Sequence, residues 1–163
     1  NDYNLESRLD KCTGLINYVK YIESQGATVD GIGTQMHISL NTDKDKIVQM
    51  FQLLAASGKL IKISELDVRL GTNAPTVEQQ AAQAAMYQYV IDSYKKYIPA
   101  AQQYGITIWG ISDNKNEHEY WLPDESPNLW DANYARKHAY KGTADGLAGK
   151  DVSLGFSGEL TKK

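Results

Sequence analysis

Two stretches in the first third of the chain repeat apolar residues every three or four positions, the spacing of one helical face. The first covers about residues 5–25 and precedes Gly26, a common residue just after a helix; its apolar positions are Leu9, Leu15, Ile16, Val19 and Ile22. The second begins at Thr42, with Asp43 and Asp45 in its first turn, and stops at Gly58; its apolar positions are Ile47, Met50, Phe51, Leu54 and Ala55.

Two more helices are predicted further along the chain. Thr76 and Gln79 have the spacing of a capping box, in which each side chain bonds the backbone N–H of the other residue. The long helix that follows passes through Ala85, Tyr89 and Tyr94, and Pro99 is expected to interrupt or kink it. A last helix is predicted over residues 131–140.

Three short apolar runs between these helices are typical of strands. They cover residues 29–37, 60–68 and 106–113, and residues 1–4 read as the stub of a fourth strand. A long polar loop is expected to reach about residue 128, and the chain from residue 142 onward is expected to be irregular or a short strand.

Strands that alternate with long helices indicate an α/β fold with parallel strands and helical crossovers. Two architectures fit this pattern. One is a small open sheet with helices on its faces, which the length of 163 residues favours. The other is part of an eight-stranded barrel, for which about 250 residues is typical.

Composition excludes several classes of function. Hydrophobic residues make up 42% of the chain, which argues against disorder and against a single membrane-spanning helix. The formal net charge of −3, without blocks of like charge, argues against binding nucleic-acid phosphates. The one cysteine, Cys12, excludes an internal disulfide framework and is expected to be a buried apolar residue.

Known short motifs are also missing from the chain. The chain has no close pair of histidines that would suggest a metal site. It contains Gly31 and Gly33 but not the third glycine of a dinucleotide-binding loop. No Gly-x-Ser-x-Gly elbow of a serine hydrolase is present. The chain opens without an initiator methionine, so we interpret it as a fragment or a processed piece.

Functional side chains collect where the predicted strands end. They form three pairs that would each share one face of a strand: Gln35 with His37, Glu65 with Asp67, and Trp109 with Asp113. Carboxyl ends of parallel strands form the active sites of such folds, and carboxylates beside an indole suit carbohydrate chemistry. Each residue also has a structural interpretation: Glu65 as an ion-pair partner, His37 as a core histidine, Trp109 as core and Asp67 as a loop cap.

The three strand segments resemble glycoside hydrolase family 10, the retaining endo-β-1,4-xylanases. The matching stretches are residues 29–37, 63–67 and 108–113, with residues 1–4 similar to the end of the family's fifth strand and 129–131 and 137–140 similar to its closing segment. The resemblance covers residues 1–141 and implies the C-terminal half of a TIM (β/α)8 barrel, from the end of strand five through helix eight. Residues 142–163 form a tail with no assigned role.

The resemblance implies roles for six residues. Glu65 matches the nucleophile, His37 the histidine beside it, and Asp67 the aspartate that orients this histidine. Gln35, Trp109 and Trp121 match residues that bind the sugar. His138 stands where the family more often has proline.

The resemblance also implies what else the enzyme needs. The family's acid/base glutamate follows a motif that these 163 residues do not contain, so the N-terminal half of the barrel is the expected partner. Xylan is the expected substrate, no cofactor or metal is implied, and the expected location is secreted, periplasmic or at the cell surface. Two other hypotheses for the function stay open: a non-catalytic glycan-binding or assembly half barrel, and a related retaining enzyme that acts on cellulose.

Overall fold

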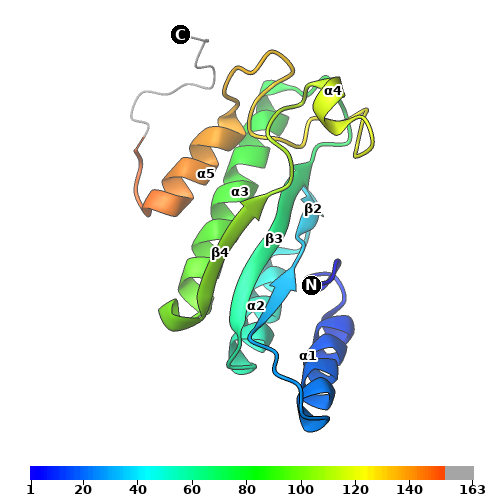
Figure 1. Cartoon of the computed structure of the whole chain (residues 1–163). Coiled ribbons are helices and arrows are strands. Elements are labelled where there is room, and N and C mark those ends of the chain that lie inside the picture. Colours follow the sequence, from blue (N-terminus) through cyan, green and yellow to red (C-terminus); the bar gives the residue numbers. More distant parts are fainter. Residues whose placement is uncertain (153–163) are drawn as a thin grey trace. The chain divides into compact units, whose positions relative to one another are not determined.

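The computed structural model describes residues 1–152 and divides the chain into two compact units. The first unit holds Asn1–His37, Thr42–Leu66 and Ser93–Thr107. The second holds Ile38–Asn41, Asp67–Asp92 and, of the described residues, 108–152. Figure 1 shows the helices and strands in chain order.

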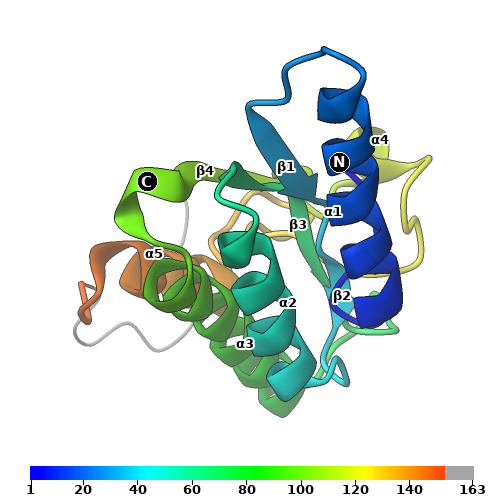
Figure 2. The ribbon, with the colours of Figure 1, turned by 90° about the horizontal axis from the view of Figure 1, so that it is seen from below.

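The first unit contains helices α1 (Leu9–Ser24) and α2 (Lys44–Ala56), which pack against each other (Figure 2). Both predicted helices are confirmed, and positive φ angles at Gly26 and Gly58 follow their ends. The predicted start at Thr42 is wrong by one residue, because the Asp43 side chain accepts the backbone N–H groups of Asp45 and Lys46.

The apolar face of α1 includes Cys12, which is fully buried. Cys12 is therefore a core residue, as predicted, and burial raises the pKa of its thiol to about 11. The stripe of α2 is buried as well; its innermost residues are Ile47, Met50, Phe51 and Leu54.

Four strands form one sheet: β1 (Gly31–Thr34), β2 (His37–Ser39), β3 (Leu60–Arg69) and β4 (Gln103–Ile108). β1, β2 and β4 all pair with β3. β1 and β3 are parallel, with Gly31 opposite Leu60 and Thr34 opposite Ile63. Asp2 forms a further parallel bridge to Thr34, which confirms the predicted strand stub at the start of the chain.

Two strand predictions need correction. The single strand predicted over residues 29–37 is two strands, because Met36 has a φ of 67° that breaks the extended chain. The strand predicted over 106–113 begins earlier, at Gln103, and ends at Ile108. Gly110 follows with a φ of 94°, which turns the backbone out of the strand.

Helix α3 (Val77–Tyr97) starts at the predicted capping box: Gln79 N donates to Thr76 Oγ1 at 3.2 Å, and Thr76 N donates to Gln79 Oε1 at 2.9 Å. Pro99 lies beyond the end of this helix and precedes a short 3-10 turn, Ala100–Gln102. Pro99 therefore follows an unbroken helix and does not kink it.

Two further helices belong to the second unit: α4 (Lys115–His118), one turn within the predicted loop, and α5 (His138–Ala148). The helix predicted over 131–140 is wrong, because Asp131 instead forms a turn in which its side chain accepts the N–H groups of Asn133 and Ala135. The chain beyond residue 142 is not irregular at first, since α5 continues to Ala148.

α5 packs closely on α3 in the second unit. A Cβ atom at Gly142 would lie 2.1 Å from the backbone oxygen of Ala84, and one at Gly146 would lie 3.1 Å from Ile91 side-chain atoms. α5 also crosses the predicted boundary between residues 141 and 142, so the division into a barrel part and a tail stays a prediction. The rest of that tail, residues 153–163, lies outside the described residues. No helix within residues 1–152 has the length and apolar character needed to span a membrane.

Candidate active site

In the first unit, each oxygen of the Glu65 carboxylate has a hydrogen-bonding partner. His37 Nε2 lies 3.1 Å from Oε2, and Asn1 Nδ2 donates to Oε1 at 2.9 Å. Asn1 also donates to Ser64 Oγ at 3.0 Å. The side chains of His37 and Glu65 are only 11% and 16% exposed, so this carboxylate is held in one orientation in a partly desolvated place.

The burial pattern of β3 changes at Glu65. Ile61 and Ile63 are buried two residues apart, but the next buried apolar position is Leu66, three residues on. A regular strand would put Glu65 on the buried face with Ile63. The alternation of buried positions breaks at Ser64–Glu65, where Glu65 is only partly buried and is hydrogen-bonded by His37 and Asn1.

Backbone bonds fix the neighbouring segments. Glu65 N donates to Gln35 O at 3.0 Å, and Gln35 N donates to Asp2 O at 2.9 Å. Gly33 makes room for the first residue, because a Cβ there would lie 2.6 Å from Asn1 Cβ. The Gly-x-Gly pair of the sequence thus serves close chain packing in this unit.

Gln35 is the third predicted site residue of the first unit. It is half-buried in the break between β1 and β2, two residues before His37. The first unit thereby brings together the predicted nucleophile, the predicted histidine and Gln35.

Asp67 and Trp121 meet in the second unit. Asp67 is fully buried, and its Oδ2 accepts a hydrogen bond of 2.7 Å from Trp121 Nε1. Trp121 keeps 38% of its surface exposed, so one end of the indole is anchored while its ring remains accessible. Trp109, also in this unit, is 42% exposed just beyond the end of β4. The predicted contact of Asp67 with His37 stays a prediction.

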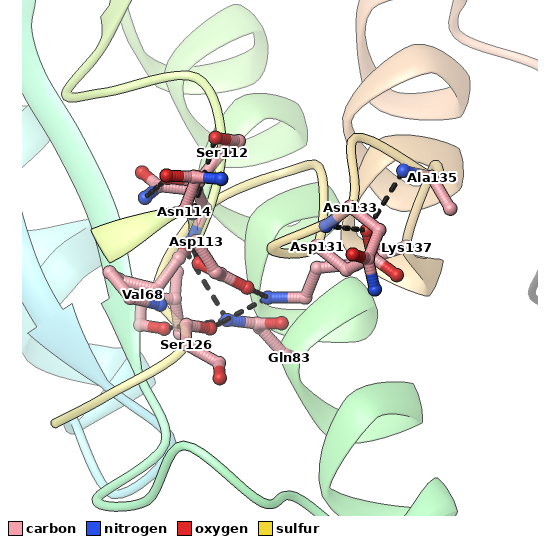
Figure 3. A network of polar contacts seen from close by, with 12 residues as sticks. Val68, Gln83, Ser112, Asp113, Asn114, Ser126, Asp131, Asn133, Ala135 and Lys137 are labelled. Carbon is pink, nitrogen blue, oxygen red and sulfur yellow. Dashed lines mark hydrogen bonds and ion pairs between the residues drawn. The ribbon is translucent and has the colours of Figure 1, made fainter. Parts of the chain in front are cut away.

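Asp113 does not belong with these residues, contrary to the pairing with Trp109 drawn from the sequence. It is 8% exposed and forms a 2.7 Å ion pair with Lys137, which is 6% exposed (Figure 3). Lys137 also donates to Ser126 O at 2.7 Å, and Asn128 N donates to Asp113 Oδ1 at 2.9 Å. Burial lowers the pKa of Lys137, and the Asp113 carboxylate opposes this effect.

This buried network supports the loop that carries Trp121. Gln83 of α3 donates from Nε2 to Val68 O and Ser126 O, both at 2.8 Å. The end of the loop at Ser126 is thereby fixed to β3 and α3, and Asn128 N ties it to Asp113 at the other end. The network is structural, and it explains how a long polar loop can hold an aromatic side chain in place.

Asn1 is the site residue that pattern reasoning did not find. It opens the segment recognised as the end of a strand, but a single asparagine carries no charge pattern or periodicity. Only the fold brings it to Glu65, 64 residues away in the chain. Within residues 1–152 no group of three histidine, cysteine or acidic residues is arranged to hold a metal ion.

The model of the family "Glycosyl hydrolase family 10" matches residues 1–146. The chain therefore belongs to glycosyl hydrolase family 10. It is 34% identical over 148 residues to the exoglucanase XynX of Acetivibrio thermocellus, covering 89% of this chain and 13% of that protein. It is 33% identical to an endo-1,4-beta-xylanase of Agaricus bisporus, covering 90% of this chain and 43% of that protein.

Solved structures give the same assignment. A thermostable mutant of the xylanase Xyn10A from Cellvibrio japonicus matches with a TM-score of 0.82 and 31% identity, over 91% of this chain and 49% of that one. A mutant of Xylanase10C from the same organism, in complex with xylopentaose, matches with a TM-score of 0.81 and 32% identity, over 92% and 33%. These neighbours confirm the predicted α/β fold as part of a TIM barrel, and this chain spans less than half of each of them.

Proposed function

We propose that this chain is the nucleophile-bearing part of a retaining endo-1,4-β-xylanase. The observation that carries the proposal is Glu65 in β3, whose two oxygens are separately held by His37 and Asn1. A nucleophilic carboxylate must stay ionised and in a fixed rotamer, and two donors at separate oxygens serve both needs. Family membership and the xylanase relatives give this geometry its chemical context.

The proposed reaction has two steps. The Glu65 carboxylate attacks the anomeric carbon and forms a covalent glycosyl-enzyme, while the bond from that carbon to the leaving oxygen breaks and the leaving oxygen takes a proton from an acid. Water then attacks the same carbon, gives its proton to the conjugate base of that acid, and releases Glu65. The configuration of the sugar is retained after two inversions.

The acid/base carboxyl group is proposed to come from polypeptide outside residues 1–163, the N-terminal half of the barrel. It belongs about 5–5.5 Å from Glu65, the separation that leaves no room for an intervening water in the first step. Within the chain, Asp67 is buried against Trp121 and Asp113 against Lys137, so neither carboxylate serves as this acid.

The remaining predicted residues take supporting roles in this proposal. His37 holds Glu65, and Asp67 orients His37. Gln35, Trp109 and Trp121 line the sugar site, the two indoles offering exposed ring surface for stacking on a pyranose. Xylan or xylo-oligosaccharide is the substrate, and secretion to the periplasm, cell surface or medium is the proposed location.

The experiment is turnover on xylan by the 163-residue chain, alone and mixed with a polypeptide that carries the first four barrel strands. The chain alone is expected to be inactive, since general acid help contributes about 10²–10⁴-fold and the other sugar contacts are also missing. The mixture is expected to be active, and Glu65→Gln in the mixture to be inactive. Full activity of the chain alone would contradict the assignment of the acid.

Two alternatives correspond to other outcomes of the same assay. Sugar binding without turnover in the mixture would identify a non-catalytic glycan-binding or assembly module. Greater activity on cellulose than on xylan would favour the cellulose-acting enzyme, an option supported by the name of the Acetivibrio thermocellus relative.

A further inference from the structure

A cavity of ≈ 450 Å³ lies on one face of the sheet in the first unit. Two strands supply most of its lining: Gly31 and Gly33 come from β1, and Leu60, Lys62 and Ser64 come from β3. The strands pair in parallel, with Gly31 opposite Leu60 and Gly33 opposite Lys62. On each strand the lining residues are two positions apart, so they lie on the same face of the sheet.

The other face of these strands belongs to the core of the unit. Ile32, Ile61 and Ile63 alternate with the cavity-lining residues and are at most 4% exposed. In a TIM barrel, helices cover the outer face of the strands, and the inner face closes into a core filled by layers of side chains. The face that bears the cavity is therefore the one that becomes the barrel interior when the remaining strands are added.

β1 cannot fill this interior with side chains of its own. A Cβ atom at Gly31 would lie 2.9 Å from the backbone oxygen of Leu60, and one at Gly33 would lie 2.6 Å from Asn1 Cβ. Barrel interiors are packed as densely as other protein cores, so side chains from other strands must occupy the volume beside these glycines. In the proposed function, those strands belong to the N-terminal half of the barrel.

Lys62 places a positive charge in the same volume. Its side chain is half-buried, and its Nζ lies 5.9 Å from the centroid of the Tyr104 ring. Among the contacts of the described residues, the Lys62 ammonium makes no hydrogen bond and no ion pair. Asp30 also lines the cavity, but it is an exposed residue before the start of β1 and forms no ion pair with Lys62 in the described part of the chain.

Completing the barrel removes the Lys62 ammonium from water. A charge in a packed interior carries a large desolvation cost, which a counter-charge with good hydrogen bonds offsets. The Tyr104 ring attracts a cation through its face but supplies no negative charge. The interior therefore needs an anionic group beside Lys62, and the strands that close the barrel are the elements that can deliver one.

We propose that the N-terminal half of the barrel presents a carboxylate side chain to Lys62, and that this ion pair forms part of the interface between the two halves. The inference rests on the proposed function, which supplies the partner half, and adds a rule for which half barrels this chain accepts. A partner with an apolar or cationic side chain at that position leaves the ammonium buried and unpaired, so it is rejected.

The test is the affinity of the 163-residue chain for the polypeptide that carries the first four barrel strands, measured by titration calorimetry. Lys62→Met keeps the length of the side chain and removes its charge, which leaves the partner's carboxylate without a counter-ion. We expect the affinity to fall roughly a hundredfold or more, as is typical when one member of a buried ion pair is removed. Lys46→Met, at an exposed position of α2, is the matched control and should bind like the parent chain. Circular dichroism and melting temperature check that each variant is folded.

A charge exchange separates an ion pair from a loss of packing. Lys62→Glu should associate more weakly than Lys62→Met, because two carboxylates would then face each other. The acidic residues of the partner's strands are replaced by lysine one at a time, and one of these replacements should restore the affinity of Lys62→Glu. Rescue at none of these positions would contradict the ion pair.

Two further outcomes overturn the inference and leave the proposed function standing. If Lys62→Met associates as tightly as the parent chain or more tightly, no carboxylate faces Lys62. If Asp30→Asn weakens association as much as Lys62→Met does, the counter-charge comes from this chain and not from its partner. In both cases, xylan turnover by the parent mixture still supports the proposed function. If the parent chain does not associate and the mixture does not turn over xylan, the inference and the proposed function both fail.

Discussion

At the scale of single residues, the hydrogen bond from Asn1 to Glu65 leads to a prediction about the rate of the first chemical step. Its amide is one of two donors to Glu65, so Asn1→Ala leaves Oε1 without its bond of 2.9 Å. We expect the rate of glycosyl-enzyme formation in the mixed enzyme to fall roughly tenfold or more, since hydrogen bonds to charged groups are worth about 1.5–3 kcal/mol. Single-turnover measurements of this step provide the check.

A matched control is Ser64→Ala, which removes the other acceptor of the Asn1 amide but no donor to Glu65. Its effect is expected to be smaller than that of Asn1→Ala. If both variants retain the parent rate, Asn1 contributes only to packing of the strand stub.

The second prediction for a single residue concerns Glu6 and the pH dependence of the stability. Its side chain is 3% exposed, and Oε2 finds no hydrogen-bond partner among the described residues. Burial raises the pKa of Glu6 above its ordinary 4.5, so its protonated form is favoured in the folded state. The stability that Glu6 contributes is therefore present below pH 4.5 and lost as the pH rises through the folded-state pKa.

Glu6→Gln, which cannot ionise, should consequently raise the free energy of unfolding at pH 7 by about 1–2 kcal/mol. At pH 4 the variant and the parent should differ little. Urea unfolding at both pH values measures the difference directly, and an equal difference at the two pH values would show that ionisation of Glu6 is not its cause.

At the scale of helices, two glycines give opposite expectations for the same substitution. Gly142→Ala places a methyl group 2.1 Å from Ala84 O, so α5 must move away from α3, and we expect a loss of about 1–3 kcal/mol of unfolding free energy. Gly14→Ala, on the exposed side of α1 with no atom within 4 Å, should gain about 0.5–1 kcal/mol. Thermal and urea unfolding of the two variants compare them, and a stabilised Gly142→Ala would contradict the close packing of α5.

The helices show what periodicity can and cannot predict. α1 and α2 were predictable because each has a long apolar stripe and a glycine just after its end, and α3 because the capping box at Thr76 marks its start. α5 was misplaced because its small residues Gly142 and Gly146 read as loop, whereas their lack of a side chain is what lets α5 lie against α3. The packing of α5 on α3 is a tertiary contact, and it leaves no apolar stripe in the sequence from which the helix could be predicted.

The strands, too, have some features that the sequence predicts and others that it does not. An apolar run identified β3, but such a run does not reveal that the alternation of buried positions breaks at Ser64–Glu65. The break at Met36 was also hidden, because a positive φ at a non-glycine residue has no sequence signature.

At the scale of the whole molecule, the sequence predicted the fold class, because its strand ends follow the order of glycosyl hydrolase family 10. The roles of the six predicted site residues stay predictions; among these residues, the structure brings His37 to Glu65 and Trp121 to Asp67. Asn1 was missed, since only folding joins positions so far apart in the chain. Asp113 was misjudged for the same reason: its partner, Lys137, is 24 residues away in the chain.

The central claim is that Glu65 is the nucleophile of a retaining xylanase, and covalent trapping tests it most directly. The chain, mixed with a polypeptide carrying the first four barrel strands, is incubated with an activated 2-fluoro-xylobioside, which slows release of the glycosyl-enzyme more than its formation. Mass spectrometry of the proteolysed protein should find the sugar on the peptide containing Glu65, and Glu65→Gln should remain unlabelled. A label on Asp67 or on Glu117 of α4, or labelling that persists in Glu65→Gln, would contradict the account.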